Sequence, residues 1–269
     1  MKYKIGDVAK FLGISPDLLR YYEKKGVVHP EKGRSNDYRY YDTWDMNFLV
    51  DCLWYKGFGF GIDQIAQMVT ASSYSELIGI MAEKEADIYE NLRLQELLLS
   101  RTREYLDEMR VAQSLLGTCS ISESPEIVRY LNRYNFIYDE SPDVQQLAQQ
   151  WLRYIPFTHR CFDVEQDVVI NGGNDYAWGF SLGMQYVKEF NILTEPPVLH
   201  LPPQTCVHSV FTSSGKNNFT PRLMDYMVNW ANENGWTVCG NARGHLLCSA
   251  LEDNELTGFF EAWIPVSRN

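Results

Sequence analysis

The chain has 269 residues, of which 45% are hydrophobic and 22% are charged, as expected for a folded protein large enough for two domains. Its first residues are charged and amphipathic, unlike the apolar core of a signal peptide. No stretch approaches the run of about 18 apolar residues that a membrane helix needs. We therefore expect a soluble, cytoplasmic protein without a membrane segment.

The charges of the chain are divided unevenly along its length. The net charge is −11, but residues 1–41 hold nine Lys and Arg against five Asp and Glu, and the remainder holds 15 against 30. A basic head on an acidic body is expected when only one end of a protein contacts nucleic-acid phosphates. The six cysteines show neither C-x-x-C spacing nor a neighbouring spaced His pair, so we expect no metal site and no cofactor.

Residues 1–74 predict a winged helix-turn-helix. A short amphipathic helix ends at Gly13, and Ser15 caps a second helix directly after it. The polar, turn-rich and then aromatic segment 30–41 suits a β-ribbon wing. A third helix follows, and a fourth short helix begins at Asp63. The expected buried stripe of the third helix consists of Trp44, Phe48, Leu49, Cys52 and Leu53.

Residues 75–118 predict one long dimerisation helix. The stretch is rich in Glu, Leu, Arg and Ala, lacks Pro, and ends where Gly117 can cap it, as is typical of a coiled coil. The alternative is a long helix that packs only on its own domain. Two series recur every seven residues: Leu77, Lys84, Asn91, Leu98, Tyr105 and Ala112, and Met81, Ile88, Gln95, Thr102, Met109 and Leu116.

Residues 119–269 predict a duplicated strand-helix-strand-strand domain with an antiparallel sheet, which makes the whole chain α+β. Hairpin turns are expected at 172–174 and 252–254. Two fused copies would place helices on one face of the sheet and leave a concave opposite face. The first copy is expected as a strand over 126–138, a helix over 143–154 and strands over 160–170 and 175–190. The second is expected as a strand over 198–212, a helix over 222–234 and strands over 244–251 and 255–266.

The first segment resembles the MerR family of transcriptional regulators. The residues that carry the resemblance are I-G-x-V-A from Ile5, L-R-Y-Y-E-x-x-G from Leu19 and R-Y-Y from Arg39, in this order. The resemblance implies a homodimer held by an antiparallel coiled coil. It also implies a promoter with an overlong spacer, which the protein distorts for RNA polymerase once an effector binds.

The third segment resembles the GyrI-like effector-binding domain of multidrug-responsive MerR members. The evidence is its size, its topology and the ending F-F-E-A-W-I-P-V from Phe259. No cysteine lies between Cys52 and Cys119, where the metal-sensing branch of the family places ligands. The size of the third segment and the absence of these cysteines both indicate an organic effector.

The DNA contacts are expected on the second helix, the wing and the turn after the third helix. The planar guanidinium of Arg20 can hydrogen-bond a phosphate or a guanine edge, and tyrosine hydroxyls can donate to phosphates. The alternatives are core packing for the tyrosines and solvated surface charge for the arginines. The candidate DNA-binding residues are Ser15, Arg20, Tyr21, Tyr22, Arg34, Tyr38, Arg39, Tyr40 and Lys56.

The last predicted strand carries one carboxylate in an apolar setting. Strand alternation places Glu261 on the same face as Phe259 and Trp263. A carboxylate between aromatic rings is costly to bury unless a cation satisfies it, and the rings add cation–π contacts. The GyrI-like resemblance implies the same role, so we expect a small, lipophilic and cationic organic ligand. The candidate ligand-binding residues are Glu261, Trp263, Phe259, Tyr154, Trp178, Tyr186 and Phe211, the last four being equally candidates for plain core.

These features together predict a homodimeric transcriptional regulator that binds promoter DNA and a small organic ligand and is not an enzyme. For Glu261 the alternative is a local Arg partner or exposure to solvent. Two other functions remain open. One is a DNA-binding repressor whose last domain binds a protein partner. The other is a GyrI-like hydrolase with Glu261 as general base, although the histidines lack a recognisable catalytic context.

Overall fold

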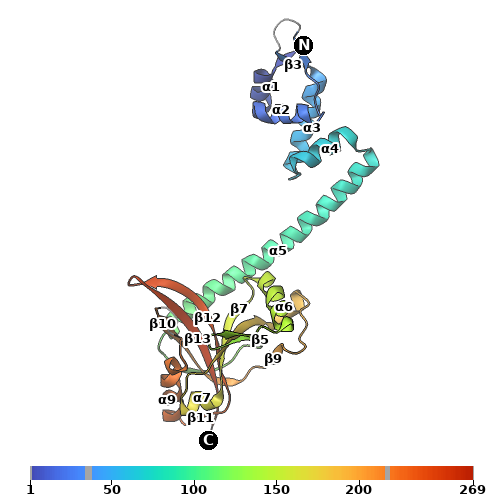
Figure 1. Cartoon of the computed structure of the whole chain (residues 1–269). Helices are drawn as coiled ribbons and strands as arrows, with labels where there is room; N and C mark the ends of the chain where they lie inside the picture. The colour runs from blue at the N-terminus through green and yellow to red at the C-terminus, as the bar shows by residue number, and fades with distance from the viewer. Residues whose placement is uncertain (1, 34–37, 216–218, 269) are drawn as a thin grey trace. The chain divides into compact units, whose positions relative to one another are not determined.

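The structure, a computed structural model, describes residues 2–33, 38–215 and 219–268 (Figure 1). The chain forms two compact units, Met1–Gln95 and Glu96–Asn269, and each unit is described by itself. The boundary between them falls within the long helix, so each unit contains one part of that helix. In the described ranges, no helix combines the length and the apolar character that crossing a membrane requires.

The N-terminal unit contains the predicted helix-turn-helix. Ser15 Oγ accepts a hydrogen bond from Leu18 N at 3.2 Å and so caps the second helix, and Gly13 has the positive φ of 65° that closes the turn before it. The wing is a three-stranded sheet of order β1-β3-β2. The elements are β1 (Tyr3–Lys4), α1 (Ile5–Leu12), α2 (Pro16–Lys24), β2 (Glu31–Lys32), β3 (Arg39–Tyr41), α3 (Thr43–Gly57) and α4 (Ile62–Ala71).

One hydrophobic core joins these helices and the wing. Leu19 of α2, Leu49 of α3 and Ile65 of α4 are fully buried in it. The prediction was wrong for Trp44, which is 68% exposed. At 3.6 residues per turn, Trp44 points about 140° away from Leu49 and therefore cannot share its buried stripe.

Helix α5 (Tyr74–Leu115) confirms the predicted long helix and has 42 residues. Its first part packs on the N-terminal unit through Leu77. Its second part packs on the C-terminal unit, where Leu98 and Ala112 join hydrophobic clusters and Tyr105 Oη donates to Leu247 O at 2.7 Å. The chain's own domains therefore contact most of the first predicted heptad series, and an intermolecular seam along it stays a prediction.

A different stripe of α5 is exposed. Leu92, Leu99 and Leu106 are spaced by seven residues and are 56%, 51% and 46% exposed. Members of the second predicted series fall between them at steps of three and four residues, the spacing of a coiled-coil seam. We call this stripe the α5 seam and define it by Ile88, Leu92, Gln95, Leu99, Thr102, Leu106 and Met109.

The C-terminal unit is built on an antiparallel sheet, as predicted. The strand order is β4-β10-β13-β12-β7-β8-β5-β6, with β9 paired to β5 and β11 to β13. The long hairpin of β12 and β13 is the red pair of arrows in Figure 1. The strands are β4 (Ser120–Glu123), β5 (Ile127–Tyr134), β6 (Ile137–Tyr138), β7 (His159–Val164), β8 (Ala177–Gly183), β9 (Leu199–Leu201), β10 (Thr205–Ser214), β11 (Trp236–Val238), β12 (Ala242–Glu252) and β13 (Glu255–Arg268). The helices are α6 (Pro142–Trp151), α7 (Gln166–Asn171), α8 (Met184–Glu189) and α9 (Asp225–Glu233), with 3-10 turns at Leu152–Tyr154 and Pro221–Met224.

Several predicted strands are interrupted in the structure. The strands expected over 160–170 and 175–190 end early and continue as α7 and α8, and the strand expected over 126–138 turns back after β5. The turn at 172–174 therefore joins a helix to a strand and is not a hairpin. The structure therefore does not show the predicted duplication of a strand-helix-strand-strand pattern.

The two faces of the sheet differ in polarity. On one face, Phe162 and Phe260 pack with Met227 of α9 in a large hydrophobic core, and α6 covers a second core over β5 and β8. On the other face, many alternate residues of the same strands are charged or polar, among them His159 and Glu261. The second part of α5 lies along this polar face, which contains the candidate ligand site.

Candidate functional site

The second helix of the helix-turn-helix presents Arg20 and Tyr21 at its surface. Arg20 Nη1 lies 2.5 Å from Asp17 Oδ1, and both side chains are more than half exposed, so the pair is weak and open to competition by a phosphate. Tyr21 Oη donates to the Asp63 carboxylate, and this contact raises the pKa of Tyr21. Lys25 pairs with the same carboxylate at 2.5 Å. The result is a polar surface on which phosphates can compete for existing partners.

The structure corrects one predicted DNA contact. Tyr22 is fully buried in the core of the N-terminal unit, and burial raises its pKa to about 12. Tyr22 points about 100° away from Tyr21 on α2, and this direction faces the core. Tyr22 is therefore a core residue rather than a phosphate donor.

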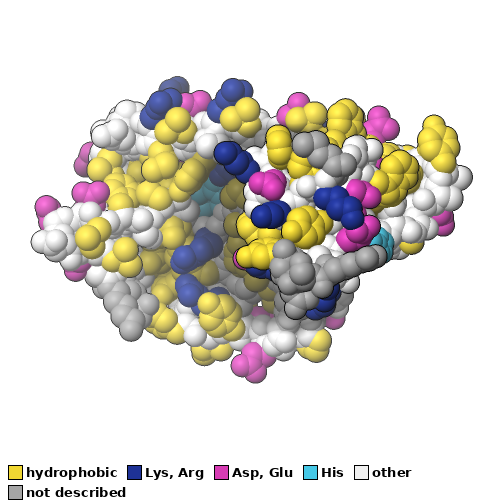
Figure 2. All heavy atoms as spheres, turned by 90° about the horizontal axis from the view of Figure 1, so that it is seen from above, with side chains coloured by type: hydrophobic (Ala, Val, Ile, Leu, Met, Phe, Trp, Pro, Cys, Tyr) yellow, Lys and Arg dark blue, Asp and Glu magenta, His cyan; other side chains and the backbone are white. Residues whose placement is uncertain are grey.

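The wing is tied to the second helix by an ion pair. Arg39 Nε lies 2.6 Å from Glu23 Oε2, with side chains that are 37% and 25% exposed. Tyr38 is 58% exposed, Tyr40 is half-buried, and Lys56 is exposed in the last turn of α3. Arg34 lies outside the described residues. On the face of the molecule drawn in Figure 2, Lys and Arg side chains lie among hydrophobic and acidic ones.

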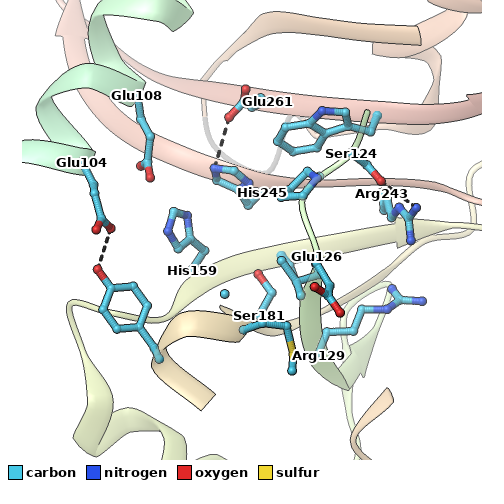
Figure 3. A pocket seen from close by; sticks show the side chains of 18 of the residues that line it. Glu104, Glu108, Ser124, Glu126, Arg129, His159, Ser181, Arg243, His245 and Glu261 are labelled. Carbon is cyan, nitrogen blue, oxygen red and sulfur yellow. Dashed lines mark hydrogen bonds and ion pairs between the residues drawn. The ribbon is translucent and has the colours of Figure 1, made fainter. Parts of the chain in front are cut away.

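A pocket of about 640 Å³ opens on the polar face of the C-terminal sheet (Figure 3). In its wall, Glu261 Oε1 lies 2.7 Å from His208 Nε2, and Glu261 Oε2 lies 3.5 Å from His245 Nε2. All three side chains are only 12–13% exposed. The Trp263 ring stacks on His208 with centroids 4.9 Å apart. The predicted carboxylate therefore lies in a mostly buried wall with an indole and two imidazoles.

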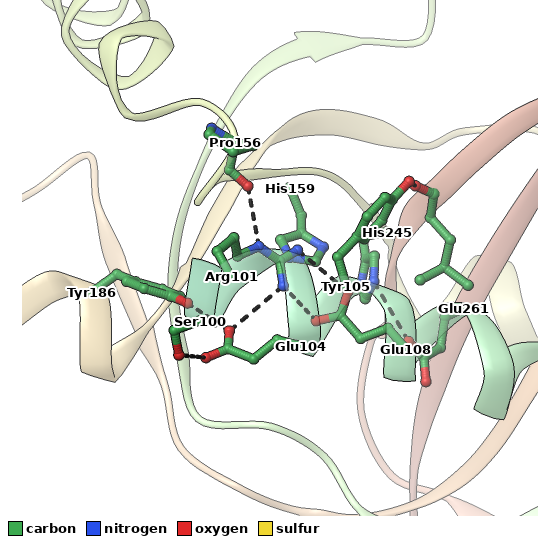
Figure 4. A network of polar contacts seen from close by, with 11 residues as sticks. Ser100, Arg101, Glu104, Tyr105, Glu108, Pro156, His159, Tyr186, His245 and Glu261 are labelled. Carbon is green, nitrogen blue, oxygen red and sulfur yellow. Dashed lines mark hydrogen bonds and ion pairs between the residues drawn. The ribbon is translucent and has the colours of Figure 1, made fainter. Parts of the chain in front are cut away.

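Helix α5 supplies the facing wall through a network around Arg101 (Figure 4). Arg101 is 5% exposed, and its Nη1 donates to Glu108 Oε1 at 2.8 Å. Its Nη2 lies 2.7 Å from His159 Nε2, and its Nε donates to Pro156 O at 3.1 Å. Because a guanidinium can only donate, His159 Nε2 must accept and carry no proton.

Two of the pocket histidines are neutral at neutral pH. Burial lowers the pKa of His159 to about 4. Burial also lowers the pKa of His245 well below its ordinary range, helped by the nearby His159 and Arg101. Neither imidazole therefore neutralises the carboxylates around it.

The other end of the pocket is basic. Arg129 is 6% exposed, and its Nη1 pairs with Asp163 Oδ2 at 2.6 Å. Arg243 is 8% exposed, and its Nη2 donates to Ser124 Oγ at 3.0 Å and to Gln204 Oε1 at 2.6 Å. The pocket therefore combines buried charges of both signs.

The structure brings three of the predicted ligand-binding residues together: Glu261, Trp263 and Tyr186 line the pocket, and Tyr186 Oη donates to Glu104 Oε2 at 2.5 Å. The other four do not line it. Phe259 shares the pocket face but packs between the end of α5 and Val210. Trp178 and Phe211 belong to the core on the opposite face, and Tyr154 stacks on Phe190 at 4.9 Å.

The sequence reasoning missed His208 and the buried arginines of the pocket. Arg243 and His245 alternate along β12, so a period of two already places them on one face with Leu247. Arg101, Glu104 and Glu108 follow one another at helical spacing on α5, which also marks a common face. What the sequence could not supply was the pairing of β10 with β13 and of β7 with β12.

Comparison with known proteins identifies the N-terminal unit. Residues 3–72 match the model of the MerR HTH family regulatory protein. The HTH-type transcriptional activator mta of Bacillus subtilis is 26% identical over 106 residues, which cover 39% of this chain and 41% of that protein. The activator TipA of Streptomyces coelicolor is 29% identical over 156 residues, which cover 56% of this chain and 55% of that protein. This chain thus matches about half or less of the length of these relatives.

Among solved structures, the cryo-EM structure of the EcmrR–DNA complex in EcmrR-RPo aligns with 99% of this chain and 100% of its own, at 18% identity and a TM-score of 0.37. Both curated relatives named above are described as HTH-type transcriptional activators. By its residues 3–72, the chain matches the MerR HTH family regulatory protein, and its N-terminal unit is similar to the helix-turn-helix of that family.

Proposed function

We propose that the protein is a cytoplasmic, homodimeric transcriptional activator that binds promoter DNA and acts with RNA polymerase when a small organic cation occupies its C-terminal pocket. The observation that carries the proposal is a mostly buried carboxylate, Glu261, in the pocket wall of a chain that begins with a MerR helix-turn-helix. A concave pocket lined by mostly buried side chains favours a small ligand over a protein partner, which would need a flatter surface.

DNA binding rests on the exposed face of α2. Arg20 is 57% exposed and can exchange Asp17 for a phosphate or a guanine edge. We expect Arg20→Ala to weaken binding to a selected promoter fragment about 10- to 100-fold, since such contacts contribute about 1–3 kcal/mol.

This prediction is checked by fluorescence anisotropy on fragments that the full chain selects from a genomic library. Arg153→Ala is the matched control, because Arg153 is exposed and lies in the C-terminal unit. Equal affinities for wild type and Arg20→Ala would show that α2 is not the recognition helix.

Dimerisation rests on the α5 seam. Its leucines are about half exposed, although a long exposed apolar stripe is unfavourable in water unless a second helix covers it. We expect the double variant Leu99→Lys, Leu106→Lys to raise the dimer dissociation constant at least ~100-fold, because it places four cations in one small interface.

Sedimentation equilibrium of the full chain measures this change. Val111→Lys is the control, because Val111 is 51% exposed on the same helix but lies off the seam. A double variant that stays dimeric at the wild-type concentration would place the interface elsewhere.

The cationic ligand rests on the charges of the pocket. Arg101 Nη1 lies 2.8 Å from Glu108 Oε1 and 3.6 Å from Glu104 Oε2, whereas Glu261 contacts the imidazoles of His208 and His245. The neutral His159 and His245 add no positive charge at this end of the pocket. A cation would bind Glu261 while the Trp263 face supplies a cation–π contact. A ligand there contacts α5, the helix that also carries the seam. Coupling follows if the ligand favours one arrangement of that helix over another.

The experiment is in vitro transcription from a selected promoter, with bacterial RNA polymerase and tetramethylrhodamine methyl ester as a lipophilic cation. We expect the dye to raise transcript yield with the wild type and not with Arg20→Ala. A yield that is unchanged by a dye that demonstrably binds would remove the activator mechanism.

A further inference from the structure

The charges of the pocket are separated into two ends (Figure 3). Glu104, Glu108 and Glu261 lie toward one end, and Arg129 and Arg243 lie toward the other. A ligand with a cation alone would compensate only the acidic end. The positive charge at the basic end would stay uncompensated by such a ligand.

Arg243 is a buried guanidinium without a buried counter-charge. It is 8% exposed, and the oxygens that accept its hydrogen bonds, Ser124 Oγ and Gln204 Oε1, are neutral. No carboxylate lies within ion-pair distance of it among the residues that the structure describes, and its Nε is buried without a hydrogen-bond partner there. A buried cation is strongly unfavourable unless an anion pairs with it.

Nearby acidic groups leave this charge uncompensated. Asp163 faces Arg243 across β7 and β12, but its carboxylate is held by Arg129 at 2.6 Å and by Asn241 Nδ2 at 3.0 Å. Glu123 and Glu126 line the rim, where both are exposed and contact Thr205 and His200 respectively. The basic end therefore carries a net positive charge behind an acidic rim.

The two ends are a short distance apart on neighbouring strands. Arg243 pairs in register with Trp263, and His245 pairs with Glu261. Arg243 and Glu261 are thus diagonal neighbours on one face, with Cα atoms about 7–8 Å apart. Trp263 lies beside Glu261 on the same strand face and opposite Arg243, so an aromatic surface adjoins both charges.

We propose that the pocket binds a zwitterion: an aromatic or lipophilic molecule with its cationic group at Glu261, its ring system on Trp263 and a carboxylate or similar anionic group at Arg243. The inference rests on the proposed function, since it specifies the ligand class of the same pocket. Ser124, already bonded to Arg243, supplies a hydroxyl at the anionic subsite.

Two dyes that differ by one methyl group test this inference on the full-length protein. Tetramethylrhodamine has a cationic xanthene and a free carboxylate, and its methyl ester keeps the cation but loses the anion. Isothermal titration should show the acid binding at least ~10-fold more tightly than the ester, the gain expected from one charge-assisted hydrogen bond to a buried guanidinium.

Variants of Arg243 test whether this residue causes the preference for the acid over the ester. Arg243→Gln should reduce the ratio of ester to acid dissociation constants to about one, and Arg243→Lys should retain part of it. Arg160→Gln is the control, because Arg160 lies on the same sheet but points to the opposite face, so the ratio should keep its wild-type value. Comparison of the two dyes on the wild type needs no variant, so the inference stays testable if Arg243→Gln does not fold.

The outcomes separate this inference from the proposed function. If the ester binds as tightly as the acid to wild type, the zwitterion inference fails while the cation-binding pocket stands. If neither dye binds, both fail together. A preference for the acid that survives in Arg243→Gln would overturn the assignment of the anionic subsite to Arg243.

Discussion

The variant Arg101→Met is expected to lose about 3–5 kcal/mol of the free energy that holds the C-terminal unit folded. Arg101 is 5% exposed and joins Glu108, His159 and the carbonyl of Pro156. Methionine fills a similar volume but leaves the Glu108 carboxylate part-buried without its cation. Breaking a buried pair by removing one partner is strongly destabilising, because the remaining charge stays uncompensated.

Native-state hydrogen exchange suits this measurement, because the chain has two units and a single unfolding transition cannot be assumed. The amides of β12 and β13 report the opening of the C-terminal sheet. Arg103→Met is the matched control, since Arg103 is exposed on the same helix and should change the opening free energy by less than ~0.5 kcal/mol. A loss below ~1 kcal/mol in Arg101→Met would mean that the network adds little to folding.

The same network explains why α5 belongs to the ligand site. Its second part would be an ordinary amphipathic helix if it only covered the sheet through Leu98 and Ala112. Instead, its pocket-facing positions are ionic, and Glu104 and Glu108 extend from it into the pocket lining. A ligand that engages these carboxylates therefore acts on the helix itself.

The local signals of the N-terminal half predicted its elements well. The cap at Ser15, the left-handed Gly13 and the Pro-free stretch after residue 74 each act within a few residues, so no tertiary information was required. The hairpin at 252–254 belongs to the same class, because Asp253 and Asn254 adopt the positive φ of a two-residue turn, 49° and 66°.

The errors arose where packing decides between helix and strand. Val168 and Val169 favour a strand by propensity, yet they form α7, whose Val169 packs into the core with Met224 and Met227. Packing also affects the first predicted heptad series. Leu98 and Tyr105 fit a heptad, but contacts within their own unit occupy them.

The ligand site was predicted only as far as one strand reaches. Alternation on β13 was enough to place Glu261 and Trp263 on one face. His208 and His159 come from β10 and β7, which lie beside β13 and β12 only through the strand order of the sheet. Arg243 comes from β12, the hairpin partner of β13. His208 and His159 lie more than fifty positions before Glu261 in the sequence and join it by topology, which no local pattern encodes.

Glu261→Gln is expected to weaken binding of tetramethylrhodamine methyl ester about 10- to 100-fold. Removing one partner of a buried charge contact costs several kcal/mol of binding free energy, and the desolvation of the charged ligand, which opposes binding, offsets part of this loss. The amide preserves the shape of the side chain and keeps an oxygen for His208, so it removes the charge with little change in packing. Glu233→Gln, on the exposed end of α9, should leave the dissociation constant unchanged. Affinity within twofold of wild type in Glu261→Gln would move the cation contact to Glu104 or Glu108. The same substitution at those two positions would then show which carboxylate of the α5 wall binds the cation.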